Sequence, residues 1–251
     1  MTLQQGGKTV YGATVGILML ETRFPRIPGD IGNATTWPFP VHYRIVQGAT
    51  PDLIVRHDAR AMRDAFIREA QALVQMGCDG IVTNCGFLSI IQDDLKTALG
   101  VPVASSSLMQ VPMIAQTLPP GQRVGVLTIS KDSLTPDHLA GAGVPLDTPI
   151  MGTDAGRCFS EAILSDHNEI DFDACRRDLI DAARSLVASH DDIGAIVLEC
   201  TNMVPYARDI RLATGLPVYS IYTLVTWFQA ALSPRRFPSE LDDPRQGFLS
   251  Q

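Results

Sequence analysis

Two stretches of the chain, G80-I-V-T-N-C85 and A195-I-V-L-E-C200, share one pattern: a short apolar run that ends in a cysteine. Two further stretches, G100-V-P-V-A-S105 and G215-L-P-V-Y-S220, match each other at the same offset along the chain. A Gly-hydrophobic-Pro-Val pattern is common where a helix turns into a strand, so the second match could arise by itself. Such a common turn pattern would not explain why both halves also have a cysteine at the matching position. The repeat therefore predicts two similar halves.

Strands and helices are predicted to alternate along both halves. Continuous Val, Ile and Leu runs are typical of strands covered on both faces, as in a parallel sheet; they occupy residues 14–20, 80–83, 101–104, 123–128, 194–198 and 216–219. Apolar residues at helical spacing predict helices at 58–77 and 172–187, and a third begins near residue 222. This alternation indicates an α/β protein with mostly parallel pairing.

The halves are expected to form two lobes. The first lobe would span residues 1–118 and be completed by the C-terminal segment 223–251, and the second would span residues 119–222. A long Pro- and Gly-rich segment, residues 21–40, has the length and composition of a flap or an active-site wall.

Composition and charge limit the classes of partner. The chain has 251 residues and a formal net charge of −7, which argues against nucleic acid or an anionic membrane as the main partner. The N-terminus has no secretory signal pattern, and five cysteines, an odd number, do not suggest a disulfide framework. We therefore expect a cytoplasmic protein with free thiols.

Cys85 and Cys200 are the candidate catalytic residues. Ligands of open α/β sheets bind at the carboxyl ends of the strands, so related halves would place one thiol on each wall of a shared cleft. One thiolate could remove a proton from a carbon, and the opposite thiol could return a proton to the other face. A thiol has an ordinary pKa of about 8.5, which nearby donors can lower toward neutrality.

Small polar residues around the cysteines are the candidate substrate-binding groups. Backbone N–H groups at the start of a following helix are free to hold a carboxylate. The candidates are Thr83, Asn84, Gly86, Phe87, Thr201, Asn202, Ser105, Ser106, Thr128 and Ser130. For each Ser and Thr, capping of a helix N-terminus is the alternative role.

Charged residues near the first strand add one more candidate. Arg23 follows residues 14–20 and could bind a carboxylate with its two-pronged guanidinium, with a solvated surface charge as the equal alternative. The roles of Glu21, Asp30 and Glu199 are left open by the sequence. No His or Cys spacing suggests a metal site, and no phosphate-binding glycine motif is present, so we expect neither a metal nor a cofactor.

The two cysteine blocks, the second of which continues as C200-T-N202, resemble those of the aspartate/glutamate racemase superfamily. The resemblance covers nearly the whole chain in order and spacing. It implies two Rossmann-like lobes related by a pseudo-two-fold axis, an active site in the cleft between them and a cofactor-independent mechanism that uses Cys85 and Cys200. Glutamate racemases usually have Asn-Thr after the first cysteine, whereas Gly86-Phe87 follow here, and Asn202 stands where they usually have His.

The resemblance leads us to expect an isomerase, a racemase or epimerase of an amino acid or a derivative such as a hydantoin. The substrate would be a small carboxylate or amide, and the protein a homo-oligomer, as superfamily members often are. Chemistry like that of maleate isomerase or arylmalonate decarboxylase, on the same scaffold, is the alternative. A non-catalytic binder of small acids and a thiol redox sensor are the alternatives outside enzymes.

Overall fold

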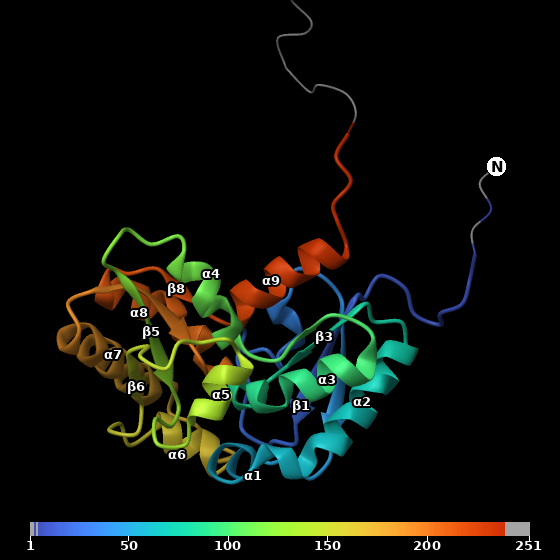
Figure 1. Ribbon diagram of the computed structural model, residues 1–251. Helices are drawn as coiled ribbons and strands as arrows, with labels where there is room; N and C mark the ends of the chain where they lie inside the picture. The colour runs from blue at the N-terminus through green and yellow to red at the C-terminus, as the bar shows by residue number, and fades with distance from the viewer. Residues whose placement is uncertain (1–2, 4, 239–251) are drawn as a thin grey trace, which may run out of the picture.

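Two parallel four-stranded sheets form the framework of the protein (Figure 1). In the computed structural model, which describes residue 3 and residues 5–238, the sheets have the equivalent orders β2-β1-β3-β4 and β6-β5-β7-β8. The strands are β1 (Val15–Leu20), β2 (Val41–Val46), β3 (Gly80–Thr83), β4 (Val103–Ala104), β5 (Arg123–Thr128), β6 (Ile150–Gly152), β7 (Ile193–Leu198) and β8 (Val218–Tyr219). The predicted α/β fold with two similar parallel lobes is confirmed.

Helices cover the faces of both sheets. The α-helices are α1 (Pro51–Arg56), α2 (Arg63–Gln75), α3 (Gln92–Leu99), α4 (Val111–Ala115), α5 (Pro136–Gly141), α6 (Phe159–Leu164), α7 (Phe172–Ser189), α8 (Ala207–Thr214) and α9 (Ile221–Leu232). Short 3-10 helices are η1 (Ala34–Thr36), η2 (Ala59–Met62), η3 (Gly86–Ile91), η4 (Ser107–Gln110) and η5 (Thr201–Tyr206). In the described part of the chain, none of the helices combines the length and the apolar character needed to cross a bilayer.

The repeated Val-Gly pairs in β1 and β5 have a packing role. A Cβ atom on Gly16 would lie 3.0 Å from Leu73 of α2, and one on Gly125 would lie 2.9 Å from Leu186 of α7. In each lobe, a glycine in the central region of the sheet therefore lets the long covering helix approach closely. Both leucines are fully buried, so the close approach extends the core rather than leaving a gap.

Two strands were not predicted from the sequence, and both lie at sheet edges. β2 has polar and apolar residues mixed and is mostly half-exposed, while β6 has three residues, all half-exposed. The continuous apolar pattern identifies strands that are covered on both faces, such as β1 and β7. β2 and β6 lack that pattern.

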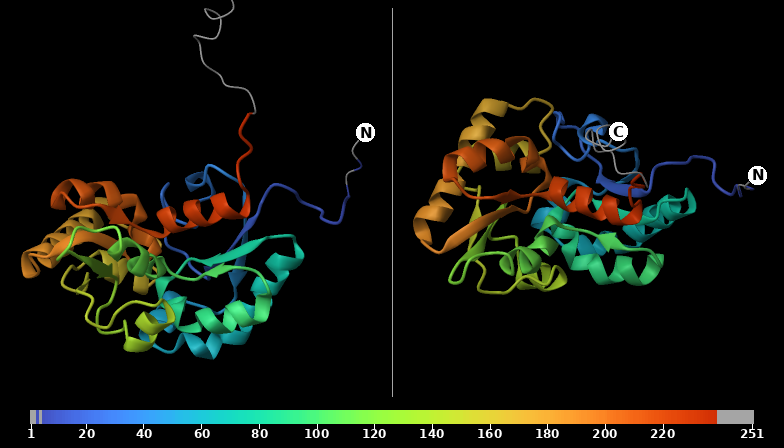
Figure 2. Two further views of the ribbon diagram at one scale, coloured as in Figure 1. Left: turned by 45° about the horizontal axis from the view of Figure 1, so that its top comes forward. Right: turned by 90° about the horizontal axis from the view of Figure 1, so that it is seen from above.

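The helix α9 spans the junction of the lobes, where it packs on β3 and β4 of the first sheet and on β8 of the second (Figure 2). Its buried residues Leu224, Val225 and Phe228 share a core with Val15 and Val82 of the first sheet. This is the segment that the sequence analysis assigned to the first lobe. The remainder of the expected segment, residues 239–251, lies outside the described residues.

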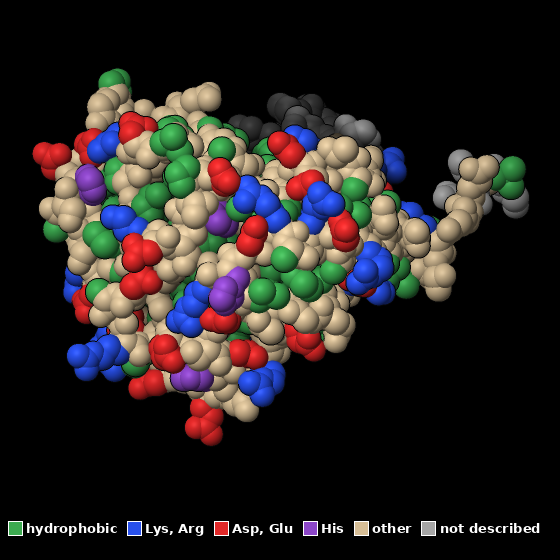
Figure 3. Space-filling model, turned by 60° about the horizontal axis from the view of Figure 1, so that its bottom comes forward, with side chains coloured by type: hydrophobic (Ala, Val, Ile, Leu, Met, Phe, Trp, Pro, Cys, Tyr) green, Lys and Arg blue, Asp and Glu red, His purple; other side chains and the backbone are tan. Residues whose placement is uncertain are grey.

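The lobes are joined by close contacts near η3. Gly141, the last residue of α5 in the second lobe, packs against the backbone of Ser89 in η3 of the first lobe. Ser107 of η4 donates a hydrogen bond to the carbonyl oxygen of Leu198 at 2.6 Å. The face drawn in Figure 3 carries interspersed acidic and basic side chains. The ion pairs Arg60–Asp137 at 2.7 Å and Arg23–Asp166 at 3.2 Å link the lobes.

The close approach of α5 to η3 predicts that Gly141→Ala destabilises the protein. Alanine is ordinarily the better helix former, but here its Cβ would collide with the carbonyl oxygen of Ser89. We expect a loss of about 1–3 kcal/mol in the free energy of unfolding, measured by urea denaturation. Gly6→Ala is the control, because a Cβ there would meet only the Tyr11 hydroxyl at 3.8 Å. Equal stability of both variants would contradict the prediction.

Candidate active site

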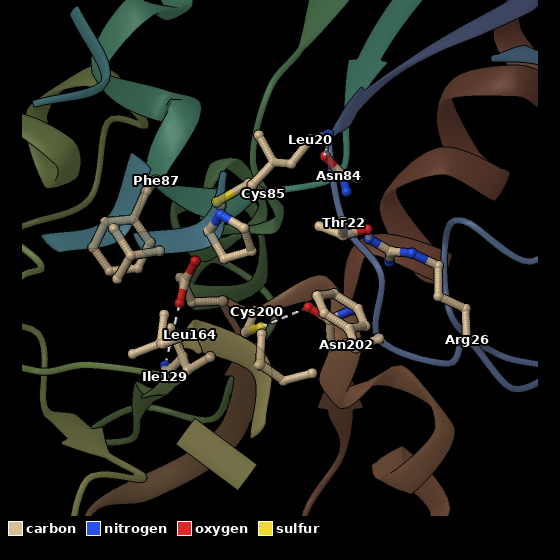
Figure 4. A pocket seen from close by; sticks show the side chains of 16 residues that line it. Leu20, Thr22, Arg26, Asn84, Cys85, Phe87, Ile129, Leu164, Cys200 and Asn202 are labelled. Atoms are coloured by element: carbon tan, nitrogen blue, oxygen red, sulfur yellow. Dashed lines mark hydrogen bonds between the residues drawn. The ribbon is translucent and has the colours of Figure 1, made fainter. Parts of the chain in front are cut away.

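Cys85 and Cys200 occupy equivalent places in the two lobes. Cys85 precedes η3 shortly after β3 ends, and Cys200 precedes η5 shortly after β7 ends. Both side chains are buried, with 8% and 7% of their surface exposed, and both line one pocket between the lobes (Figure 4). The sequence prediction that the two cysteines face a shared pocket agrees with this geometry.

The pocket has an empty volume of about 350 Å³, including its part open to solvent. It is lined by Leu20, Thr22, Phe24, Arg26, Pro51, Val55, Asn84, Cys85, Gly86, Phe87, Ile129, Ile163, Leu164, Glu199, Cys200 and Asn202. The residues come from both lobes, so the pocket depends on how the lobes pack together.

The pocket has a polar end and an apolar end, with the cysteines between them. Figure 4 shows Thr22, Arg26, Asn84 and Asn202 on one side and Phe87, Ile129 and Leu164 on the other. The apolar side is extended by α1 and α6, which contact each other and contribute Pro51, Val55 and Ile163. A ligand with one charged polar end and one bulky apolar end would match this division.

A chain of hydrogen bonds organises the polar end. Arg26 donates to Asp30 at 2.7 Å and to Thr22 at 2.9 Å, and its guanidinium lies 4.5 Å above the ring of Phe24. The other oxygen of the Asp30 carboxylate accepts from the amide of Asn202 at 2.6 Å. The Asn202 side-chain oxygen then accepts from the Cys200 thiol at 3.5 Å. Residues of the long segment 21–40 therefore orient the groups around Cys200.

Asn84 presents an amide donor to the pocket that makes no hydrogen bond to the described residues. Its side-chain oxygen accepts from the backbone N–H of Leu20 at 2.8 Å, which leaves the amide nitrogen directed toward Thr22 (Figure 4). The backbone carbonyl of Asn84 accepts from the Thr201 hydroxyl at 2.6 Å. This second bond crosses from the second lobe to the first and ties the two cysteine-bearing segments together.

Burial and Glu199 both disfavour the thiolates. Burial raises the pKa of Cys85 well above its ordinary value, and the neighbouring Glu199 carboxylate raises it further, while backbone N–H groups of Phe87 and Leu88 oppose this effect. The pKa of Cys200 is raised by the same two causes and lowered by the backbone N–H of Asn202. The N–H donors stand at the starts of η3 and η5, where such groups lack helix partners.

Glu199 is the only carboxylate that lines the pocket among the described residues. One of its oxygens accepts from the Thr128 hydroxyl at 2.8 Å and from the Ile129 N–H at 3.4 Å. The other oxygen lies against the α-carbon of Gly86, where a Cβ would collide with it. Burial raises the pKa of Glu199 to about 7, against the lowering effect of its two hydrogen bonds.

The structure brings part of the predicted substrate-binding set together. Asn84, Gly86, Phe87 and Asn202 line the pocket with the two cysteines. The others do not line the pocket. Five of them hydrogen-bond to nearby groups: Thr83 donates to the Ser105 carbonyl, Ser106 caps η4, Thr128 donates to Glu199, Thr201 donates to the Asn84 carbonyl and Ser130 donates to Ser133. The Ser105 hydroxyl is buried and makes no hydrogen bond within the described part of the chain. The capping alternative thus holds for Ser106.

Arg23 lies outside the pocket, which corrects its predicted place. Its side chain is 71% exposed and pairs with Asp166 at 3.2 Å. Arg26, three residues further along the same loop, points to the polar end instead. No local sequence pattern distinguishes the two arginines, because an irregular loop has no fixed periodicity. The walls from α1 and α6 were also missed, since neither short helix carries an amphipathic pattern long enough to recognise.

Known proteins similar to this chain fall into two groups, and no protein-family model matches it. The first group consists of curated relatives by sequence. A dimethylsulfoniopropionate lyase of Durusdinium sp. clade D is 28% identical over 224 residues, which cover 86% of this chain and 74% of that protein. Dimethylsulfoniopropionate lyase 7 of Emiliania huxleyi is 29% identical over 245 residues, which cover 93% of this chain and 69% of that protein.

The second group consists of solved structures. Allantoin racemase from Klebsiella pneumoniae has a TM-score of 0.59 at 17% identity, covering 93% of this chain and 98% of that chain. Aspartate racemase of Picrophilus torridus has a TM-score of 0.55 at 14% identity, covering 90% of this chain and 96% of that chain. Arylmalonate decarboxylase has a TM-score of 0.53 at 16% identity, covering 90% of this chain and 95% of that chain. The chain therefore has the fold of the aspartate/glutamate racemase superfamily, as the cysteine blocks suggested.

The comparisons confirm the expectation of an enzyme and correct the expected reaction. The prediction of an amino-acid racemase or epimerase is wrong, because the curated relatives that cover most of the chain are lyases. The cysteine blocks led to the right fold and to the wrong reaction. They do not distinguish the reactions that different members carry out on this fold.

The raised pKa of Glu199 predicts a pH-dependent contribution to stability. Between its ordinary value of 4.5 and about 7, the folded protein keeps a proton that the unfolded chain has lost. The stabilisation is therefore complete below about pH 4.5 and is lost as pH rises through 7, on the order of 3 kcal/mol in total. We expect Glu199→Gln to gain stability relative to wild type by about this amount between pH 5 and pH 8.

Urea denaturation at several pH values measures this difference. Glu161→Gln is the control, because the Glu161 side chain is 57% exposed and lies outside the pocket. Stability curves for wild type and Glu199→Gln that run parallel between pH 5 and pH 8 would contradict the prediction.

Proposed function

We propose that the protein is a lyase that cleaves dimethylsulfoniopropionate or a closely related β-sulfonio carboxylate. The observation that carries the proposal is that similarity to dimethylsulfoniopropionate lyases extends over 86–93% of the chain. The pocket supports it, since two thiols stand between a polar end and an apolar end. A sulfonio carboxylate has its anionic and cationic groups at opposite ends of a short chain.

The reaction requires one base and a good leaving group. The base removes a proton from the carbon next to the carboxylate, and the electron pair of that C–H bond becomes the new carbon–carbon double bond. The carbon–sulfur bond breaks, and its electron pair leaves on sulfur. Dimethyl sulfide and acrylate are released, and the base returns its proton to solvent. Because the sulfide leaves as a neutral molecule, no general acid is needed at sulfur.

We assign the role of base to Cys85. Two backbone N–H groups, from Phe87 and Leu88, favour its thiolate, and the positive charge of Arg26 acts in the same direction. Cys200 is less suited, because its thiol donates to the Asn202 oxygen and the Asp30 carboxylate opposes its ionisation. In this assignment, Cys200 forms the opposite wall and holds the substrate carbon against Cys85.

The substrate carboxylate would bind at the polar end. Arg26 carries the positive charge there, and the amide nitrogen of Asn84 is a free donor. Negative charge grows on the carboxylate oxygens as the neighbouring proton is removed, so these donors stabilise the transition state more than the bound substrate. The carbon to be deprotonated then lies between the thiols.

The first test is cleavage of dimethylsulfoniopropionate by the purified protein. Release of dimethyl sulfide and acrylate is followed by gas chromatography and liquid chromatography. We expect Cys85→Ala to lower kcat/KM by at least about 100-fold, because a positioned base contributes this much. Cys78→Ala is the matched control, since Cys78 is a buried thiol that does not line the pocket and precedes β3.

Two results would count against the proposal in different ways. Absence of both products with the folded wild-type protein would reject the lyase activity. Cleavage that survives in Cys85→Ala but is lost in Cys200→Ala would keep the activity and transfer the role of base to Cys200.

A second test compares the two arginines. Arg26→Gln should raise KM by about 10- to 100-fold, because a charge-assisted hydrogen bond to the carboxylate is lost. Arg23→Gln should leave KM unchanged, since Arg23 is exposed and pairs with Asp166. Steady-state kinetics with dimethylsulfoniopropionate measure both values. An equal change in the two variants would reject the assignment of the polar end.

A further inference from the structure

Glu199 is a buried carboxylate without a cationic partner. Among the described residues, it takes part in no ion pair, whereas the other carboxylate beside the pocket, Asp30, is paired with Arg26 at 2.7 Å. Only 1% of Glu199 is exposed. A buried charge is costly unless an opposite charge accompanies it, and the described residues supply no cation to an ionised Glu199.

The carboxylate faces the apolar end of the pocket. One oxygen is held by Thr128 and Ile129, and the other makes no hydrogen bond within the described part of the chain and lies against Gly86. Around it, the lining side chains are hydrocarbon; they are Pro51, Val55, Phe87, Ile129, Ile163 and Leu164. A methylated cation presents apolar methyl groups on the outside and a positive charge within, which suits both features of this end.

The arginine of the pocket lies at the opposite end. Arg26 is held there by Asp30 and stacks on Phe24, so it does not form an ion pair with Glu199. The pocket therefore has an arginine–aspartate pair with free donors at one end and an uncompensated carboxylate at the other. A ligand that carries an anion and a methylated cation on a short chain complements this arrangement in one orientation.

We propose that Glu199 is the counterion for the sulfonium group of the substrate and determines specificity for a cationic group on the β-carbon. This inference rests on the proposed function and assigns the end of the pocket that the cysteine chemistry leaves unused. It also sets the orientation of the substrate, with the carboxylate toward Arg26 and the sulfonium toward Glu199. The carbon that loses its proton is then held between Cys85 and Cys200.

Binding of the cation has a consequence for the thiols. The titratable groups that face Glu199 within the pocket are Cys85 and Cys200, and the Arg26–Asp30 pair lies at the other end. Ionised Glu199 raises the pKa of both thiols. A sulfonium placed beside Glu199 compensates that charge and lowers the pKa of Cys85 through its own field. The substrate thus promotes formation of the base that attacks it.

A pair of unreactive isosteres tests the proposal. Both probes carry a carboxylate and differ in charge only at the trimethyl end. The cationic probe is 3-(trimethylammonio)propanoate. The neutral probe is 4,4-dimethylpentanoate, in which an uncharged quaternary carbon replaces the nitrogen. Dissociation constants are measured by calorimetry at about pH 8, where Glu199 is ionised. We expect the ratio of the two constants to shift by at least about tenfold against the cation in Glu199→Gln, as a double-mutant cycle would report for a close charge pair.

Two controls accompany this measurement. Glu161→Gln should keep the wild-type ratio, since Glu161 lies on the surface of α6. The neutral probe should bind wild type and Glu199→Gln about equally, because Gln preserves the shape of the side chain. A ratio that is the same in wild type and Glu199→Gln would overturn the proposal.

A measurement on wild type alone decides the matter if Glu199→Gln fails to fold or loses affinity for both probes. At about pH 7, the cationic probe should lower the pKa of Glu199 and release a fraction of a proton, whereas the neutral probe should not. Calorimetry in two buffers of different ionisation enthalpy gives the number of protons released. Equal proton release by the two probes would overturn the proposal.

These outcomes are separate from those of the cleavage assay. If wild type cleaves dimethylsulfoniopropionate but the isostere ratio does not depend on Glu199, the lyase activity stands and the counterion role is rejected. If the ratio depends on Glu199 but no cleavage occurs, the cation site stands and the lyase activity is rejected.

Discussion

The hydrogen bond from the Thr201 hydroxyl to the Asn84 carbonyl, 2.6 Å long, joins the two strand ends on which the pocket is built. Each end carries a cysteine, and each would be an ordinary strand terminus without the other. A second bond across the junction, from Ser107 to the Leu198 carbonyl, supports the same alignment. Since the donors and acceptors are buried, loss of either bond would leave unpaired polar groups in the junction. The position of the thiols therefore depends on how the lobes are held together.

The scaffold and the reaction are determined by different parts of the molecule. The fold is shared with two racemases and a decarboxylase. The walls of this pocket carry an arginine held by Asp30 at one end and a buried glutamate among hydrocarbon side chains at the other. Two thiols facing one carbon suit proton transfer, and whether elimination follows depends on the group attached to the neighbouring carbon.

The side chains around the cysteines favour the neutral thiols over the thiolates. Burial and Glu199 both raise the pKa of Cys85 and Cys200, and the backbone N–H donors at the starts of η3 and η5 only partly compensate. In the proposed mechanism, the charge of the cationic substrate both recognises Glu199 and favours the thiolate that acts as base.

The sequence by itself determined the α/β class, the two lobes and the two cysteines, because each follows from a local pattern. Buried parallel strands are continuous apolar runs, and the repeat of a strand followed by a cysteine places both thiols at strand ends. The edge strands β2 and β6 lack that pattern and were missed. Asn84, Gly86, Phe87 and Asn202 were found because they adjoin the cysteines in the chain.

Only the tertiary structure decided which distant residues complete the pocket. Arg26 rather than Arg23 reaches the polar end, because the irregular loop between β1 and β2 turns one side chain inward and the other toward Asp166. Glu199 directly follows β7. Gly86 and Thr128 pack against its carboxyl group from two directions and bury it beside the thiols. Such contacts join residues far apart in the chain, and they arise from the packing of the two lobes, which no local pattern encodes.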